Sequence, residues 1–446
     1  MVQSLLPAAA VPDHTALRSS LGPAAEVVAR LWPDWPAGHG TSRLVCEYLL
    51  GRSRGWLDIS GRQQKEEQRQ QREQAEAAWS PRPTVVIDDA DGALLAAATV
   101  AGPAITAYWD DLRGERRGSA VAGLLTEAGL PQPHIAAESG HFGAPGDPEI
   151  FPRGCRVVLA APKATAALRE YLQAAAGLAE EVIVVGREKH MSTAINEALA
   201  EVFDRVDVSP GLAKCRLIIG SHPRRGGGGG PAEGAPDFPR RDTRPLRVPG
   251  AAPIEVAAYG ACYGGTQVDH GTDVLVASLI AHRTDLAPAD SSRDPAGLTV
   301  ADLGCGNGWL LANLQALVHP ATSIGIDVSK AALASAAATL GGGNQPGVQL
   351  ILADASAAAD PALDALTGSC DLIVLNPPFH TGHTVETGTA HAMIRTAHRL
   401  LTPGGRLVCV YNSHLGYRGA VERTFGVSRQ WARDRKFTVV TAVRRG

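Results

Sequence analysis

The sequence has no two cysteines at the spacing of a metal site or a redox motif. Its seven cysteines stand far apart, at positions 46, 155, 215, 262, 305, 370 and 409. Cysteine-based zinc sites and thioredoxin-like centres use close pairs such as C-x2-C. The spacing therefore predicts reduced thiols and no metal site.

The chain also lacks an excess of charge of either sign. Forty-two Lys and Arg residues stand against 45 Asp and Glu residues, which gives a formal net charge of −3. This balance argues against a protein that coats nucleic acid through its overall electrostatic field. Any contact with nucleic acid must therefore come from local basic patches.

Long uninterrupted apolar runs are missing as well. Residues 92–109 and 331–353 carry no charge, but glycines and prolines interrupt both stretches, which favours loops and short elements over a membrane-spanning helix. No basic segment followed by an apolar core stands near the first residue, so we expect no signal peptide. We expect a cytoplasmic monomer that makes no membrane contact.

The length of 446 residues predicts two or three domains. Of the thirty residues 221–250, thirteen are Gly or Pro, which helices and strands tolerate poorly. We predict a partly helical N-terminal extension at 1–80, a first domain at 81–222, a Gly/Pro-rich linker at 223–250 and a second domain at 251–446. The extension contains Gln63–Trp79, which is polar on almost every face and fits a solvated helix or linker.

Both halves alternate short apolar runs with helical stretches, which predicts α/β folds with doubly wound parallel sheets. Strands are expected at 83–87, 156–160, 181–185 and 215–219, and again at 298–303, 323–327, 348–353, 371–375 and 406–411, with a possible antiparallel edge at 430–443. VVLAAPK at 157–163 has the place in its half that IVLNPPF at 373–379 has in the other, and Asp88 has the place of Asp302. We interpret the halves as an internal duplication.

A glycine-rich turn follows the strand at 298–303. Gly304, Gly306 and Gly308 alternate there, and an apolar helix begins directly after them. Glycines let the backbone turn tightly and approach a ligand, while the amides at the helix start offer donors, so a nucleotide-like ligand fits. A tight turn without a ligand is the alternative. A dinucleotide fingerprint would need glycine at position 309, where the sequence has Trp309.

Two acids end the next two expected strands. Asp327 ends the second strand, where a carboxylate can accept hydrogen bonds from ribose hydroxyls. Asp354 ends the third. Either acid could instead cap the helix that follows it.

The fourth strand ends in Asn376-Pro377-Pro378-Phe379-His380. Two prolines favour a rigid turn that exposes carbonyl oxygens. The Asn side-chain oxygen and a neighbouring main-chain carbonyl can then accept both hydrogens of an –NH2 group, and Phe379 offers a face on which a planar ring can stack. Two such acceptors orient a poorly nucleophilic amine and stabilise the positive charge that develops on its nitrogen.

In these residues the chain resembles a known family. DLGCGNG at 302–308 is similar to the motif of class I methyltransferases that use S-adenosylmethionine (SAM). Together with NPPFH at 376–380, NSHLGY at 412–417, KFTVV at 436–440, VDHGTDVL at 268–275 and VVLAAPK at 157–163, it resembles the bacterial rRNA (guanine-N2)-methyltransferases of the RsmC/RlmG type. The resemblance implies two tandem Rossmann-like class I methyltransferase domains, the N-terminal one degenerate.

The resemblance also implies roles for particular residues. Asp302 would meet the ammonium group of SAM and Asp354 its adenine amino group, and the cofactor would be held by Asp302, Gly304, Gly306, Asn307, Gly308, Asp327 and Asp354. Asn376, Pro377, Pro378 and Phe379 would hold the N2 amine of a guanine in ribosomal RNA, either free or in a ribosomal subunit. The first half, with Gly92 as its single glycine after the first strand and Ala161-Pro162-Lys163 in place of Asn-Pro-Pro, should neither bind SAM nor catalyse.

Other functions stay open at this point. The same Asn-Pro-Pro turn suits adenine N6 or the side-chain amide of a protein glutamine, and a non-catalytic RNA-binding or ribosome-assembly factor is a further alternative. A nicotinamide oxidoreductase is disfavoured by Trp309. Eight basic residues at 418–445 lie near Tyr417 and Trp431; they could follow an RNA backbone and stack a base, or form a solvated face.

Overall fold

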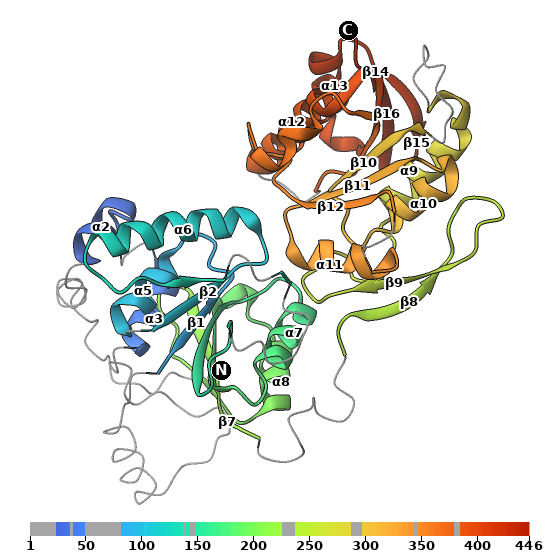
Figure 1. Ribbon diagram of the computed structural model, residues 1–446. Helices are drawn as coiled ribbons and strands as arrows, with labels where there is room; N and C mark the ends of the chain where they lie inside the picture. The colour runs from blue at the N-terminus through green and yellow to red at the C-terminus, as the bar shows by residue number, and fades with distance from the viewer. Residues whose placement is uncertain are drawn as a thin grey trace, which may run out of the picture. The chain divides into compact units, whose positions relative to one another are not determined.

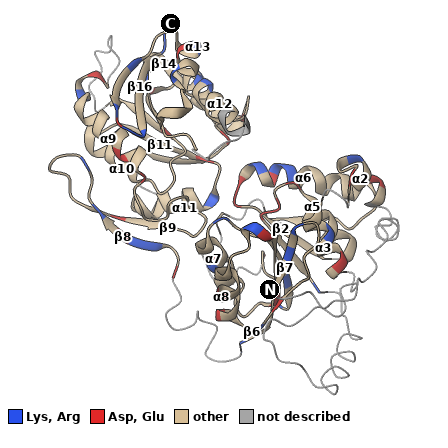
Figure 2. Ribbon diagram, turned by 180° about the vertical axis from the view of Figure 1, so that it is seen from behind, with Lys and Arg blue, Asp and Glu red and all other residues tan. Residues whose placement is uncertain are grey.

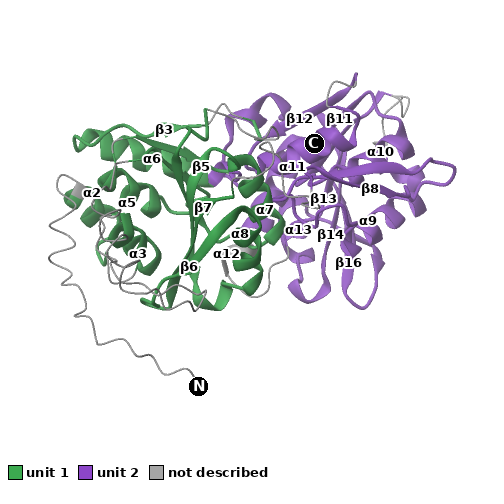
Figure 3. Cartoon of the chain, turned by 90° about the horizontal axis from the view of Figure 1, so that it is seen from below, with its two compact units in different colours: residues 1–109, 114–236 green, residues 110–113, 237–446 purple. Residues whose placement is uncertain are grey.

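The computed structural model describes residues 24–35, 39–49, 82–102, 104–136, 140–141, 149–224, 237–286, 297–342, 346–378 and 384–445. The chain forms two compact units (Figure 3). The first comprises residues 1–109 and 114–236, and the second comprises 110–113 and 237–446. Within the described ranges no helix is both long and apolar enough to cross a membrane.

The first unit contains a seven-stranded sheet and its helices (Figure 1). Its strands are β1 (Thr84–Ile87), β2 (Ile105–Tyr108), β3 (His134–Ile135), β4 (Cys155–Ala160), β5 (Ala179–Arg187), β6 (Phe203–Val208) and β7 (Cys215–Pro223). Its helices are α2 (Ala24–Leu31), α3 (Gly40–Leu49), α5 (Ala93–Ala101), α6 (Leu112–Glu127), α7 (Thr165–Ala175) and α8 (Thr193–Val202), with a 3-10 turn η1 (Glu188–His190).

The second unit contains another seven-stranded sheet and a separate two-stranded ribbon. The sheet consists of β10 (Thr299–Leu303), β11 (Thr322–Asp327), β12 (Val348–Leu352), β13 (Cys370–Leu375), β14 (Leu401–Asn412), β15 (Arg429–Arg433) and β16 (Phe437–Val443). The helices are α9 (His270–Ala281), α10 (Trp309–Val318), α11 (Lys330–Thr339), α12 (Thr384–Leu400) and α13 (Arg418–Phe425), with 3-10 turns η2 (Arg283–Asp285), η4 (Pro361–Leu366) and η5 (Ser413–Leu415).

The two large sheets have the same topology. Their strand orders are β3-β2-β1-β4-β5-β7-β6 and β12-β11-β10-β13-β14-β16-β15. In each, the first five strands pair in parallel and the last two add antiparallel. Each sheet is therefore Rossmann-like and mixed, which confirms the predicted α/β class and the two similar halves.

The ends of the first strands and the starts of the helices after them correct part of the residue correspondence predicted between the halves. β1 ends at Ile87 and β10 at Leu303, and α5 and α10 begin at Ala93 and Trp309, each after a glycine with a positive φ angle. Equivalent positions therefore differ by 216 (303 − 87 and 309 − 93), which is also the spacing of the predicted match between 157–163 and 373–379. Asp88 therefore corresponds to Gly304, not to Asp302, whose counterpart is the apolar Val86. Likewise Asn-Pro-Pro corresponds to residues 160–162 and not to 161–163.

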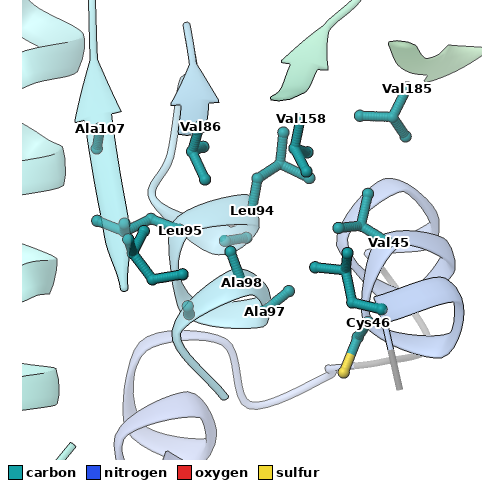
Figure 4. Packing of buried hydrophobic residues seen from close by; sticks show 14 of the residues in the cluster. Val45, Cys46, Val86, Leu94, Leu95, Ala97, Ala98, Ala107, Val158 and Val185 are labelled. Atoms are coloured by element: carbon teal, nitrogen blue, oxygen red, sulfur yellow. The ribbon is translucent and has the colours of Figure 1, made fainter. Parts of the chain in front are cut away.

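The core of the first unit includes helices from the predicted N-terminal extension. Val45 and Cys46 of α3 belong to one buried cluster with residues of α5 and with Val86 and Val158 of the sheet (Figure 4). These four side chains are fully buried, as expected for strand and helix faces that remove apolar surface from water. Residues 24–35 and 39–49 thus belong to the first unit, while Gln63–Trp79 lies outside the described residues.

The predicted linker at 223–250 is not a linker throughout. Residues Arg240–Arg244 form β8, which pairs antiparallel with β9 (Ile254–Ala258). The Lys and Arg positions on β8 are blue in the ribbon of Figure 2. β9 is held to α11, since the Ala257 amide donates to Thr339 Oγ1 at 3.0 Å and the Tyr259 amide to Ser335 Oγ at 2.9 Å. The ribbon therefore belongs to the second unit.

Candidate cofactor and amine site

The glycine-rich turn lies at the carboxyl end of β10, where strand order reverses between β10 and β13. Ligands in doubly wound folds bind at this reversal. Gly304, Gly306 and Gly308 have φ angles of +87°, +51° and +80°, a region that side chains rarely adopt. Among the described residues, a Cβ atom at Gly306 would meet no atom within 4 Å, and one at Gly304 only Met393 Cε at 3.9 Å. The turn thus borders open space that a ligand can fill.

Asp302 stands in β10, two residues before Gly304. The residue is 1% exposed, and neither carboxylate oxygen has a hydrogen-bond partner among the described residues. Burial raises the pKa of Asp302 well above its usual range, and the neighbouring Asp327 raises it further. A buried carboxylate of this kind needs a cation to become favourable in its charged form. The position suits a ligand with an ammonium group.

Asp327 is bound to the same turn. Its Oδ2 accepts from the Gly306 amide at 3.0 Å and its Oδ1 from the Ser329 amide at 3.0 Å. Burial raises the pKa of Asp327, while these main-chain hydrogen bonds lower it. Each carboxylate oxygen keeps a further lone pair, so Asp327 can still accept from a diol.

The side chains of Asp354 and Asn307 form hydrogen bonds to neighbouring groups of the protein. Asp354 Oδ1 accepts from the Ser356 amide at 2.8 Å and from Ser356 Oγ at 2.5 Å. Asn307 donates from Nδ2 to the Gly265 carbonyl at 2.9 Å and accepts from the Trp309 amide at 3.1 Å. These hydrogen bonds leave the second oxygen of Asp354 for a ligand, and Asn307 keeps one Nδ2 hydrogen and one Oδ1 lone pair.

The Asn-Pro-Pro corner stands beside the glycine-rich turn. β10 and β13 are neighbouring parallel strands, with Asp302 opposite Val374 and Leu303 opposite Leu375, so Gly304 and Asn376 leave the sheet at the same level. Asn376 Oδ1 is buried and has no hydrogen-bond partner among the described residues. Phe379 and His380 lie outside those residues. The corner therefore presents an acceptor with free capacity next to the candidate cofactor turn.

Two residues that the sequence reasoning missed contact this corner. Asn376 Nδ2 donates to Asp269 Oδ2 at 3.1 Å and to Thr272 Oγ1 at 2.8 Å. Both belong to the start of α9, whose N-cap is Asp269. Both lie in VDHGTDVL at 268–275, a segment that carries part of the family resemblance. Taken by itself, an Asp at a helix start is typical of an ordinary helix cap, so the segment did not indicate a partner more than a hundred residues away.

The aromatic residues near the basic C-terminal segment do not fit the predicted role of stacking a base. Tyr417 is 2% exposed and packs against Tyr411 and His391. The Trp431 ring stacks on His282 at 4.4 Å between centroids and lies 5.6 Å from the Arg406 guanidinium carbon. Both rings are engaged within the protein because they complete its own packing.

The first unit has lost the corresponding groups. With the halves aligned on the ends of β1 and β10, Val86 stands at the position of Asp302 and Ala160 at that of Asn376. Ile87 pairs with Tyr108 and Leu303 pairs with Ile326, so the residues after these partners, Trp109 and Asp327, have equivalent positions. Trp109 is 1% exposed and donates from Nε1 to the Asp89 carbonyl at 2.6 Å. A Cβ at Gly118 would approach its ring to 2.1 Å, so the indole lies directly on α6 and fills this place.

Comparisons with known proteins agree with this geometry. The model of the methyltransferase small domain matches residues 253–441. The ribosomal RNA large subunit methyltransferase G of Pseudomonas putida is 31% identical over 295 residues, which cover 64% of this chain and 70% of that protein. The ribosomal RNA small subunit methyltransferase C of Chromohalobacter salexigens is 34% identical over 194 residues, which cover 44% of this chain and only 53% of that protein.

A solved structure has the same fold. The 16S rRNA N2 methyltransferase RsmC of T. thermophilus, in complex with AdoMet and guanosine, superposes with a TM-score of 0.60 at 22% identity, and the match covers 83% of this chain and 90% of that one. The Asp302 carboxylate, which no group in the described part of the chain pairs with, and the open glycine turn fit SAM, which carries an ammonium group and no phosphate. The chain therefore belongs to the methyltransferases with a methyltransferase small domain that are related to RsmC and RlmG, and it is a SAM-dependent enzyme.

Proposed function

We propose that the protein methylates the exocyclic N2 amine of a guanine in ribosomal RNA. The observation that carries this proposal is the buried Asn376 Oδ1, an acceptor without a partner among the described residues, at the corner beside the glycine turn. The relatives named above are ribosomal RNA methyltransferases. A guanine amine is a planar –NH2 group with two hydrogens to donate, which matches an amide oxygen and an adjacent main-chain carbonyl.

The second unit would hold the cofactor. Asp302 would pair with the ammonium group, Asp327 would accept from the ribose hydroxyls and Asp354 from the adenine amine through its free oxygen. Gly304, Gly306, Asn307 and Gly308 would contribute close-approaching main chain. SAM, when bound, supplies an electrophilic methyl group on a sulfonium sulfur.

The corner would hold the base. Asn376 Oδ1 and the Pro377 carbonyl accept the two amine hydrogens, Pro378 stiffens the turn, and Phe379 stacks on the ring. Acceptors fixed in this way stabilise positive charge on the amine nitrogen, so no strong base is needed. A base within a helix would have to be extruded to reach them.

We propose that catalysis resides in the second unit, from Asp237 onward, and that the first unit binds no SAM because Val86, Trp109 and Ala160 replace the residues that would hold cofactor and amine. The first unit would then either stabilise the second unit or hold the RNA. One SAM per chain is the stoichiometry that this arrangement requires.

The substrate is tested by offering several acceptors to the full chain. Methyl-labelled SAM is incubated with ribosomes, separated subunits, free rRNA and release factors, and the labelled product is digested. We expect the label in N2-methylguanosine from an rRNA acceptor. Label in adenosine or in protein glutamine would contradict the guanine assignment, and no label together with no SAM binding would favour a non-catalytic RNA-binding factor.

A further inference from the structure

We propose that Asp269 and Thr272, at the start of α9, are positioning residues that fix the orientation of the Asn376 side-chain amide. The inference rests on the proposed role of Asn376 as an amine acceptor. A primary amide can turn by 180° about its last bond, which exchanges its acceptor oxygen with its donor nitrogen. A substrate amine would be accepted by the oxygen and repelled by the –NH2 group, so the orientation decides whether the corner works.

The contact with the carboxylate selects one orientation, and the Thr272 hydroxyl, which can donate or accept, supports the orientation so selected. An ionised carboxylate only accepts hydrogen bonds, so Asp269 Oδ2, which lies 3.1 Å from the amide, requires the –NH2 group of Asn376 on its side. Thr272 Oγ1 takes the second amide hydrogen at 2.8 Å. Both hydrogens of the –NH2 group are then used, and Oδ1 is directed away from α9 and left with free capacity. Flipping the amide would place Oδ1 against a carboxylate.

The start of α9 holds the carboxylate in place. Asp269 Oδ2 also accepts from the Thr272 amide at 3.2 Å as the helix N-cap. A Cβ at Gly271 would lie 2.9 Å from Asp269 Oδ2 and 2.9 Å from Cε1 of the buried Phe437. A larger residue at position 271 would therefore press on the Asp269 carboxylate. The cap, the glycine and Phe437 thus form the support behind the Asn376 amide.

Two variants separate positioning from stability. Thr272→Val keeps the shape and the main-chain amide but removes the hydroxyl acceptor, and Thr272→Ser restores that acceptor. A neutral hydrogen bond contributes about 0.5–1.5 kcal/mol, so we expect kcat of Thr272→Val to fall about 2- to 13-fold, with Thr272→Ser close to the parent. Asp269→Ser keeps a good helix cap but removes the carboxylate, and hydrogen bonds to charged groups contribute about 1.5–3 kcal/mol, so kcat should fall roughly 10- to 150-fold.

The expected pattern is a loss in kcat with KM and Kd for SAM unchanged, measured on the amine that the parent protein methylates. Parent-like kcat in Thr272→Val and Asp269→Ser, beside an inactive Asn376→Ala, would overturn the positioning role and leave the proposed function standing. Failure of Thr272→Ser to restore kcat would also overturn it. Full activity of Asn376→Ala would overturn both proposals, whereas a product other than methylguanosine would overturn the guanine assignment alone.

Discussion

Asp302→Asn is expected to abolish tight SAM binding and to stabilise the SAM-free protein at the same time. The carboxylate is buried and lacks a hydrogen-bond partner among the described residues. Replacing it by an amide removes a charge-assisted contact worth about 1.5–3 kcal/mol, so calorimetry should show Kd for SAM rising roughly 10- to 150-fold. Thermal unfolding without SAM should show a higher Tm, because a neutral amide is cheaper to bury than a carboxylate.

The sign of the pH dependence follows from the raised pKa of Asp302. In the folded SAM-free protein this carboxyl holds its proton to higher pH than in the unfolded chain. The contribution of Asp302 to the free energy of unfolding of the SAM-free protein should therefore be highest at low pH and should decrease as pH rises through the raised pKa. Pairing with an ammonium group requires the ionised form. SAM affinity of the parent protein should therefore fall as pH is lowered through that value, and the Asn variant should lack this dependence.

Asp371→Asn is the matched control for this prediction. Asp371 is also buried, at 3% exposure, but it lies at the amino end of β13 and accepts from the Thr299 amide at 2.9 Å. The glycine turn lies at the opposite, carboxyl end of the neighbouring strand β10. Its replacement should lower Tm and leave Kd for SAM unchanged. A normal Kd in Asp302→Asn would remove Asp302 from the cofactor site.

Asn376→Ala is expected to bind SAM normally and to lose methyl transfer. Removing one group that stabilises charge in a transition state costs roughly 10²- to 10³-fold in kcat, since the acceptor acts on the amine and not on the cofactor. Single-turnover kinetics with labelled SAM and calorimetric Kd measure the two effects separately.

Asn196→Ala in α8 is a matched truncation in the first unit and should have parent-like kcat. If Asn376→Ala turned over at the parent rate, the corner would not be the amine site. If it lost SAM affinity as well, Asn376 would support the cofactor site rather than act on the substrate.

The fold could be predicted from sequence where the signals are local. The strands around Val86, Asp302 and Val374 are short apolar runs bounded by turn residues, and the glycines at 304, 306 and 308 require the positive φ angles that the structure has. β8 escaped prediction because Arg240–Arg244 is polar and follows a glycine-rich stretch. Its strand conformation comes from pairing with β9, which no local pattern encodes.

The candidate site was predictable only in part, because some of its contacts join residues that are far apart in the sequence. Asp302 and Asn376 follow strands in a recognisable pattern, but the hydrogen bond from Asn376 to Asp269 joins residues 107 positions apart. Asp88 was matched to Asp302 because both are acids at a strand end, whereas the strand ends and helix starts give it the position of Gly304. Residue type alone could not show that Trp109 fills the place of Asp327 in the first unit.

The most direct test is the ribosomal RNA of the source organism after the gene is deleted. Nucleoside mass spectrometry should show one N2-methylguanosine missing from the digest, restored by the parent gene and not by the Asn376→Ala gene. An unchanged complement of methylguanosines in the deletion strain would contradict the assignment of rRNA guanine as the substrate.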